Sequence, residues 1–478
     1  MPPLHSLLSS RSSRLIASVA GVVLLSACAV GPRYQRPDQH PPAAFKHTTP
    51  AEQSTADIKP QWWTLFGDPA LNRFVDELLR ENLDIHAAMA RVDEARAATR
   101  VARAGFLPAV SLDPSIRRSQ GNGTTSGSGR STTTIYSLPL DVSYEVDIWG
   151  RLRRQFEYFR ETERASADDL EVVRQTAVAD FVQGYFALQL YDHQTSILVE
   201  ARRLYDTQLS LTRKKFTAGL APQTDVLQAQ NQLDATRTQL LELERSRDKQ
   251  ENALAILLGR PPAEFSSIKQ VPEVAVPVIP AGLPASLLAQ RPDVAEAEHK
   301  LKAANAQVGV AEASFFPQLT LTGSAGFESM NLSGITNWEN RVWSFGPSLS
   351  LPIFQGGKLT AQLAGARATY TEIAANYRKA VLTAFREVED ELVDIHSLSR
   401  EADATEETLQ SARENVRLTE LQYRQGLTSY LEVITANQTL LNNRLALANV
   451  QNERIAATIL LIKALGGGWK TAPDAAPR

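Results

Sequence analysis

Two long runs without proline constrain the fold of this chain more than any other feature. Residues 151–218 and 358–425 contain no proline and one glycine each, although the 478-residue sequence has 25 of both. Apolar residues recur in these runs at the three- and four-residue spacing of a helix. Because a helix rises about 1.5 Å per residue, each run predicts a helix roughly 100 Å long. Such helices suit the wall of a coiled coil better than a compact core.

The two halves of the chain are similar to each other. Residues 216–259 align with residues 423–466 at a constant shift of 207, with 11 identities in 44 positions and no gap. Unrelated helices would seldom match so closely. We therefore predict two tandem repeats, 61–270 and 271–470, each made of a helix, two strands, a very long helix and a shorter helix.

The predicted strands are segments in which apolar and polar residues alternate, which is the period of a β-strand. They cover about 108–118, 133–148, 318–327 and 342–354. The polar connectors 120–130 and 328–341 are expected to be hairpin loops. Pro139, Pro347 and Pro352 do not fit a regular central strand, so we expect bulges or strand ends at these positions.

Four strands in one chain are too few to cross a bilayer alone. Unpaired strand edges cost several kcal/mol per backbone group in lipid, and the smallest known barrels have about eight strands. Two chains would supply eight such strands, and three would supply twelve with room for a passage. The predicted fold class is an α+β membrane protein: long coiled-coil α-helices plus a transmembrane β-barrel completed by oligomerisation. Without evidence of export, a soluble sandwich would explain the alternation equally well.

The N-terminal residues have the pattern of a bacterial export signal. Arg11 and Arg14 precede the apolar stretch 15–25, which is too short to span a bilayer. The next residues, Leu25-Ser26-Ala27-Cys28, resemble the lipobox at which lipoproteins are cleaved and acylated on cysteine. Ala29 in place of Asp is compatible with export onward to the outer membrane in the lipoproteins that this resembles. We expect a signal peptide at 1–27, an N-acyl diacylglycerol on Cys28, a lipidated extension at 28–60 and a C-terminal tail at 471–478.

Composition and motifs argue against nucleic-acid binding and against an enzyme. The net charge is −3 and charged residues are spread along the chain. The seven histidines are scattered, without an HExxH or a GxSxG motif, and Cys28 is the only cysteine. Gly356-Gly357-Lys358 looks like part of a phosphate loop, but Pro352 and Leu359 stand where that loop needs glycine and Ser or Thr. We expect no catalytic residues, no cofactor besides the covalent lipid, and no metal site.

Seven motifs cover much of the predicted mature chain. They are CAVGPRYQRP (28–37), WWTLFGDPALNRFV (62–75), ENLDIHAAMARVDEARA (81–97), LPAVSL (107–112), DIWGRLRR (147–154), AQRPDVAEAEHKLKAANAQVGVAEASFFPQLTLTG (289–323) and GPSLSLPIFQGGKL (346–359). Together they resemble the outer-membrane factor family, the TolC-like efflux proteins, and in particular its NodT-type lipoprotein branch.

The resemblance implies a homotrimeric, passive exit duct in the outer membrane. In that family a twelve-stranded barrel in the membrane continues as a twelve-helix tunnel through the periplasm. The implied partners are a periplasmic adaptor (membrane fusion) protein and an inner-membrane RND transporter, which supplies the energy. The implied cargo is drugs or other small toxic compounds, and the implied outcome is multidrug resistance.

The resemblance also implies two groups of site residues. The turns at Gly219-Leu220 and Gly426-Leu427 resemble the helical tips on which adaptors of this family dock. Turn geometry alone would explain these glycines as well, since a reversal between helices often needs a positive φ. The implied periplasmic gate consists of Asp225, Tyr423, Leu431, Glu432 and Thr435.

This chain departs from the family pattern at the gate. Relatives often carry Asp at the position of Thr435, and some carry a tunnel-lining arginine at that of Thr428. A ring of carboxylates around a three-fold axis would repel itself and attract cations. Asp225 and Glu432 would alternatively serve only as solvated acids at the starts of helices.

Two other functions remain compatible with the sequence. One is a TolC-like channel of a type I protein secretion system, and the other is a lipid-anchored coiled-coil scaffold without a pore. The four strands with alternating apolar and polar residues argue against the scaffold, because a scaffold without a pore needs no lipid-facing sheet. The predicted mature chain has only Met89 and Met330 as methionines, so it offers no thioether ladder for copper or silver.

Overall fold

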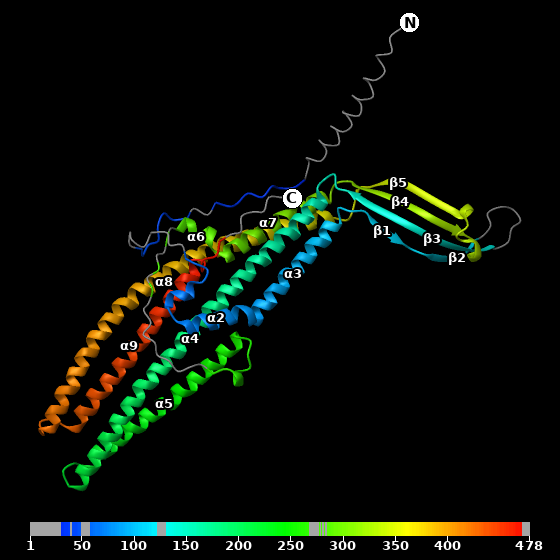
Figure 1. The fold of residues 1–478 in the computed structure, drawn as a ribbon. Coiled ribbons are helices and arrows are strands. Elements are labelled where there is room, and N and C mark those ends of the chain that lie inside the picture. Colours follow the sequence, from blue (N-terminus) through cyan, green and yellow to red (C-terminus); the bar gives the residue numbers. More distant parts are fainter. Residues whose placement is uncertain are drawn as a thin grey trace, which may run out of the picture. The chain divides into compact units, whose positions relative to one another are not determined.

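The computed structural model describes residues 30–38, 41–48, 58–121, 131–266 and 284–470, together with 277, 279 and 282. The predicted signal peptide, Cys28 and the C-terminal tail lie outside these ranges. The helical elements are η1 (Trp62–Phe66), α2 (Pro69–Glu81), α3 (Leu83–Ala104), α4 (Arg151–Thr217), α5 (Gln223–Leu257), η2 (Pro262–Glu264), α6 (Pro284–Gln290), α7 (Pro292–Ala313), η3 (Leu332–Gly334), η4 (Trp338–Asn340), α8 (Lys358–Arg424) and α9 (Tyr430–Ala464). The strands are β1 (Ala109–Leu112), β2 (Ser115–Gly121), β3 (Ser131–Val146), β4 (Gln318–Ser329) and β5 (Arg341–Ser350) (Figure 1).

The helix lengths of the two halves agree with each other. Helices α4 and α8 have 67 residues each, α5 and α9 have 35, and α3 and α7 have 22. The two long helices occupy the runs without proline almost residue for residue, which confirms their prediction. None of the described helices combines the length and the apolar content that a membrane crossing needs.

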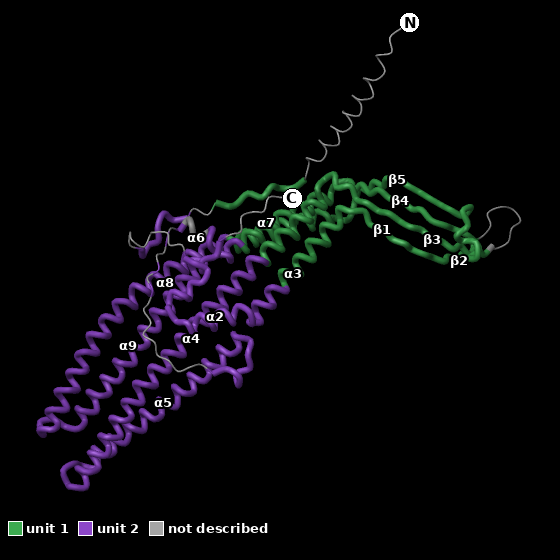
Figure 2. The backbone as a smooth tube through the Cα atoms, in the orientation of Figure 1, with its two compact units in different colours: residues 1–38, 91–166, 296–377 green, residues 39–90, 167–295, 378–478 purple. Residues whose placement is uncertain are grey.

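The chain divides into two compact units that do not coincide with the predicted repeats (Figure 2). Unit 1 consists of Met1–Asp38, Arg91–Ser166 and Glu296–Tyr377, and unit 2 consists of Gln39–Ala90, Ala167–Ala295 and Arg378–Arg478. Each unit therefore takes helices from both halves of the sequence. The reason is that helices far apart in the sequence lie side by side within each unit.

A buried charge cluster joins α4 to α7 in unit 1. The carboxylate of Glu161, whose side chain is 4% exposed, lies 2.7 Å from Nδ1 of His299 and 3.1 Å from the guanidinium of Arg164. Burial alone would raise the pKa of Glu161, but the hydrogen bond with His299 and the charges of Arg164 and Arg160 lower it overall. The cluster stabilises a contact between residues 138 positions apart.

The strands of unit 1 form one antiparallel sheet in the order β1-β3-β4-β5, with β2 also paired to β3. Strands β1 and β2 hold a single register along β3 and are separated only by Asp113 and Pro114. They correspond to the one strand predicted at 108–118. Because β1 and β2 follow one another along β3, the sheet is four strands wide, and we call each of these positions a strand line. The predicted loop at 328–341 contains η3 and η4, whereas most of the 120–130 connector lies outside the described residues.

The sheet has one apolar and one polar face, as the alternation predicted. Ladder partners extend each face across all the strands. The apolar face carries Val110, Leu112, Ile116, Tyr136, Leu138, Leu140, Val142, Tyr144, Val146, Leu319, Leu321, Ala325, Phe327, Trp343, Phe345 and Leu349. The polar face carries Ser111, Asp113, Ser115, Arg117, Ser137, Asp141, Ser143, Glu145, Thr320, Thr322, Ser324, Ser344, Ser348 and Ser350.

The expectation of a bulge or strand end at every strand proline is only partly correct. Pro352 lies beyond the end of β5, but Pro139 sits inside the regular ladder of β3, opposite Gly326. A Cβ at Gly326 would lie 2.1 Å from the Leu138 oxygen and 2.7 Å from the Pro139 Cα. Glycine on β4 thus makes room for the proline. On the other side of Pro139 the N–H of Asp113 donates to the Pro139 carbonyl at 3.3 Å, but Pro139 has no N–H to donate in return, and the strand is interrupted there between β1 and β2.

Unit 2 has an aromatic core around the start of α2. Phe66 of η1 packs against Phe186 of α4 with ring centroids 4.9 Å apart. Asp68 caps α2 by accepting hydrogen bonds from the N–H groups of its first turn. The hydroxyl of Tyr185 donates to the same carboxylate at 2.6 Å, so this cap also ties α2 to α4.

Candidate functional site: the helical tips and an N-terminal clamp

The two helical hairpins of unit 2, α4–α5 and α8–α9, turn in the same way. Gly219 and Gly426 have φ angles of 74° and 75°, and a Cβ built on either glycine meets nothing within 4 Å. The N–H of Leu220 donates to the carbonyl of Lys215 at 2.8 Å, and the N–H of Leu427 makes the matching bond at 2.9 Å. Each long helix therefore ends in a Schellman motif, for which a left-handed glycine is preferred.

Both tips present a leucine and cations to solvent. Leu220 is 78% exposed and Leu427 is 73% exposed. The last turn of α4 carries Lys214 and Lys215, and the last turn of α8 carries Arg424. The two related turns thus expose a large apolar side chain at the same place.

A cluster of aromatic rings joins the two hairpins beside the tips. The rings of Tyr423 and Tyr430 have centroids 5.6 Å apart, and Nζ of Lys215 lies 4.2 Å from the centroid of Tyr423. Burial is the main cause that raises the pKa of Tyr430, with additional effects of Tyr423 and of the nearby charge of Asp225. The neighbouring Thr212 side chain partly offsets this rise, because it lowers the pKa of Tyr430. Residues of α4, α5, α8 and α9 thus meet here.

The structure separates the predicted gate residues into two groups. Tyr423 belongs to the aromatic cluster, and Asp225 lies half-buried in the first turn of α5. Leu431, Glu432 and Thr435 share the exposed face of α9, whereas its opposite face is buried. The hydroxyl of Thr435 donates to the Leu431 carbonyl at 3.0 Å. No hydrogen bond or ion pair among the described residues joins Asp225 to these three side chains.

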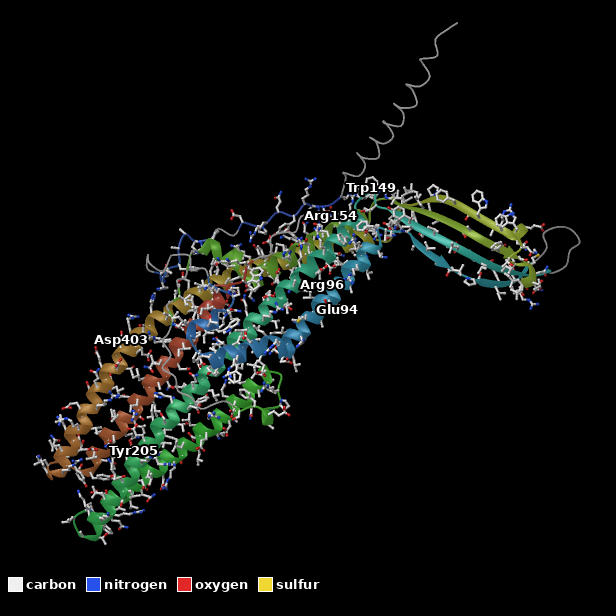
Figure 3. The ribbon with its side chains drawn as sticks, in the orientation of Figure 1. Glu94, Arg96, Trp149, Arg154, Tyr205 and Asp403 are labelled. Atoms are coloured by element: carbon white, nitrogen blue, oxygen red, sulfur yellow. The ribbon has the colours of Figure 1, made fainter. Side chains whose placement is uncertain are left out.

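One hydrophobic cluster joins the two hairpins in the region next to their tips. Tyr205, which is 3% exposed, lies in it on α4, together with Leu233 of α5 and Val433 of α9 (Figure 3). Sequence periodicity could predict that these faces are apolar, but not that α9 packs on α4 and α5. Nor did it single out Lys215, Thr212 or Tyr430, because each of them is an ordinary helix residue.

A second constellation, in unit 1, holds residues 30–36, and we call it the N-terminal clamp. The guanidinium of Arg154, at the start of α4, donates to the carbonyls of Val30, Gly31 and Pro32 at 3.4, 3.3 and 3.1 Å (Figure 3). Asn305 of α7 donates to the same Pro32 oxygen at 3.0 Å. Arg154 and Asn305 are buried, at 8% and 3% exposure, whereas Pro32 on the segment that they hold is exposed.

Backbone contacts make the clamp tight. Gly31 has a φ of 105°, and a Cβ on it would lie 2.6 Å from the Cα of Gly309. A Cβ on Gly309 would in turn meet the side chain of Arg154 at 3.0 Å. The N–H of Val30 donates to the carbonyl of Trp149 at 2.9 Å. A Cβ at Gly31 would thus clash with backbone, a Cβ at Gly309 would press only on a side chain, and the chain passes directly over α7.

The end of the clamp reaches α8. Arg36 lies 3.1 Å from the carboxylate of Glu298 on α7 and donates from Nε to the hydroxyl of Tyr377 on α8 at 3.2 Å. Tyr377 is fully buried. The sequence signal for this contact was the motif at 28–37, which indicated a family but not what the residues bind. Cys28 itself lies outside the described residues.

In the described ranges, no three His, Cys, Asp or Glu side chains gather as ligands of a metal ion would.

Comparison with known proteins identifies the family. A family model described as "Outer membrane efflux protein" matches residues 74–260 and 283–467. The chain belongs to this family. The toluene efflux pump outer membrane protein TtgC of Pseudomonas putida is 33% identical over 463 residues, which cover 95% of this chain and 96% of the relative. The probable outer membrane lipoprotein SilC of Salmonella typhimurium is 32% identical over 95% of this chain and 98% of its own length.

A solved structure agrees with these relatives. The outer-membrane channel OprN superposes with a TM-score of 0.87 at 30% identity, covering 92% of this chain and all of that chain. This outer membrane efflux protein therefore has the TolC-like channel fold. The comparisons confirm the predicted family, the outer-membrane location and the role as an exit duct in efflux.

Proposed function

We propose that three copies of this efflux protein form one passive duct, with a twelve-stranded barrel in the outer membrane and a helical tunnel below it. The observation that carries the proposal is the sheet of unit 1. One of its faces is continuously apolar, and the outer edges of β1, β2 and β5 are not paired with any described strand. In lipid such edges must be closed, and copies of the same sheet can close them edge to edge.

The matched helices support the second part of the duct. We propose that the two halves are tandem structural repeats, because their helices agree in length at 67, 35 and 22 residues. Each copy would contribute α4, α5, α8 and α9 to the tunnel wall. Frequent alanine on these helices allows close packing between neighbours.

The tips are proposed to dock a periplasmic adaptor, which would couple the duct to an inner-membrane RND transporter. Leu220 and Leu427 are the proposed contact points, since both are exposed on otherwise open turns. Gly219 and Gly426 would act by shaping these turns. The duct itself would use no energy.

The gate is proposed to lie beside the tips. Asp225, Leu431, Glu432 and Thr435 would face the tunnel axis, and Tyr423 would support them through the aromatic cluster. Three copies would bring six carboxylates, two from each chain, close to one axis. Such a ring attracts cations and repels itself, so it favours a narrow, cation-selective opening.

We propose that Cys28 carries a lipid that anchors the chain to the outer membrane. The N-terminal clamp supports this, because it begins two residues after Cys28 and holds the chain against unit 1. The proposed cargo is small toxic organic compounds, by analogy with TtgC, a toluene efflux pump protein. Selection among them is expected to lie in the pump.

Single-channel conductance in planar bilayers tests this function, together with the oligomer mass in detergent. The test variant is Asp225→Ala with Glu432→Ala, and the control is Asp403→Ala, an exposed acid on α8 outside the gate (Figure 3). We expect a trimer with small, cation-selective openings that widen in the test variant only. An unchanged conductance would remove the gate assignment and keep the duct, whereas a monomer without conductance would refute the duct.

A further inference from the structure

The apolar face of the sheet ends abruptly toward the 328–341 loop. On every strand line a large apolar side chain is followed, two residues closer to the loop end, by a polar or charged one. The pairs are Ile116 and Arg118 on β2, Tyr136 and Thr134 on β3, Phe327 and Ser329 on β4, and Trp343 and Arg341 on β5. This border is a property of the face as a whole, because it recurs on each line.

The border crosses the strands at an angle. We compare the two ends of the border along β3. Arg118 pairs with Thr134 of β3, whereas Arg341 pairs with Phe327 and through it with Leu138 of β3. The border therefore moves by four residues between β2 and β5. Four residues correspond to about 13 Å along a strand, and the three strand steps from β2 to β5 correspond to about 14 Å. The border is therefore inclined by about 40° to the ladder rows. Strands of membrane barrels are tilted by roughly 35–45°, so a level membrane surface would cross them at this angle.

The opposite end of the apolar face has the same slant. Val110 pairs with Val142, and Leu349 pairs through Leu319 with Val146, which is again a displacement of four residues. Along β3 the apolar side chains extend from Tyr136 to Val146, which is about 33 Å along the strand or about 25 Å of membrane depth at that tilt. The apolar band of outer-membrane barrels has about this height.

The two arginines at the border have donors to spare. Arg341 donates from Nη1 to the Trp338 carbonyl at 2.8 Å, and its guanidinium carbon lies 4.7 Å from the centre of the Trp338 ring. This contact occupies one of five N–H donors. Arg118 is exposed and makes no hydrogen bond or ion pair within the described ranges. Both side chains follow the apolar face, so they would lie where acyl chains give way to head groups.

We propose that Arg118 and Arg341 each bind the phosphate of an anionic lipid at the outer surface of the membrane, with Trp338 holding Arg341 in place. The proposal rests on the proposed barrel, which turns the apolar face to lipid and the loop end away from the helices. A guanidinium offers a phosphate two parallel hydrogen bonds, and the neighbouring aromatic side chains cover the start of the acyl chains.

Arg117 provides a matched control. It is adjacent to Arg118 in β2 but pairs with Ile135, so it lies on the polar face of the sheet. Replacing Arg117 removes the same charge from the same strand without changing the lipid-facing border. A general loss of positive charge and a loss of this site can thus be told apart.

The test is native mass spectrometry of the purified, acylated protein with equal amounts of phosphatidylglycerol and phosphatidylcholine in detergent. We expect the wild type to retain phosphatidylglycerol preferentially. Each arginine is expected to contribute about 1 kcal/mol, or about fivefold, to the preference for phosphatidylglycerol at its own position, so Arg118→Gln with Arg341→Gln should lower the ratio of the two adducts about fivefold. Arg117→Gln should leave the ratio unchanged. If the double variant does not assemble, each single variant should lower the ratio by roughly half, because the other arginine still binds its lipid.

Three results would overturn the inference: no change in the double variant, an equal loss in Arg117→Gln, or displacement of the lipid by inorganic phosphate alone. Conductance of the same preparations separates this inference from the duct. A conducting wild type without lipid preference would refute only the lipid site. A silent wild type whose lipid preference still follows the two arginines would refute only the duct.

Discussion

The N-terminal clamp and the helical tips both contain glycines with positive φ, but these glycines have different functions. At Gly219 and Gly426 a Cβ would meet nothing within 4 Å, so only the backbone angle favours glycine. At Gly31 the angle is also positive, and a Cβ would in addition lie 2.6 Å from the Cα of Gly309. The tip glycines serve a local turn, whereas Gly31 serves a contact between segments almost 280 residues apart. The same residue type is thus required for two separable reasons.

The largest effect is expected from Gly31→Ala. The new methyl group meets backbone atoms that cannot rotate away, and alanine is strained at this φ, so we expect a loss of about 2–4 kcal/mol. Chemical denaturation of the solubilised protein, followed by circular dichroism, measures it. If Gly31→Ala lowered the free energy of unfolding no more than Gly219→Ala does, the backbone at Gly309 would have moved aside easily. The distinction between Gly31 and the tip glycines would then be wrong.

The next largest effect is expected from Arg154→Ala. It removes a buried guanidinium together with its hydrogen bonds to three carbonyls, for an expected cost of about 2–3 kcal/mol. Cleavage of residues 30–38 by a protease should also become faster. The control is Arg96→Ala in the same unit, where solvated ion pairs with Asp93 and, at 3.8 Å, with Glu163 predict a change within about 0.5 kcal/mol (Figure 3). Equal effects in both variants would contradict a clamp built on burial.

A smaller and equal effect is expected from Gly219→Ala and Gly426→Ala. Each places alanine in the left-handed region with free space around it, which costs about 1–2 kcal/mol. Thermal melting of the two single variants and of the double variant tests whether the costs are equal and additive. Markedly unequal costs would mean that one tip has a packing partner that open turn geometry does not explain.

The smallest effect is expected from the cation–π contact between the hairpins. A double-mutant cycle with Lys215→Gln and Tyr423→Leu should give a coupling of about 0.5–1 kcal/mol, because the ammonium lies over the ring at 4.2 Å at a partly solvated place. A coupling near zero would leave the hydrophobic cluster as the main contact between the hairpins. Lys214→Gln is the matched control, since Lys214 precedes Lys215 in the same helical turn.

Much of the fold was predictable from the sequence. The long helices followed from the absence of proline over 68 residues, and the strands followed from alternation, because both patterns are set by the geometry of one segment. The regular ladder at Pro139 was not predictable, since it depends on Gly326 in a strand almost 190 residues later. The division at Asp113 and Pro114 was missed because alternation continues through it.

The sequence by itself determined the helices, the strand faces, the glycine turns at the tips and, through its motifs, the family. These features depend on neighbouring residues and on the periodicity within one segment, and both can be read directly from the sequence. Only the tertiary structure decided what Arg154, Gly31 and Arg36 bind, which side chains join the hairpins at Tyr430, and that Arg118 and Arg341 border one apolar face. Each of these depends on the register or packing of segments distant in the sequence, because side chains meet only after the backbone has brought their elements together.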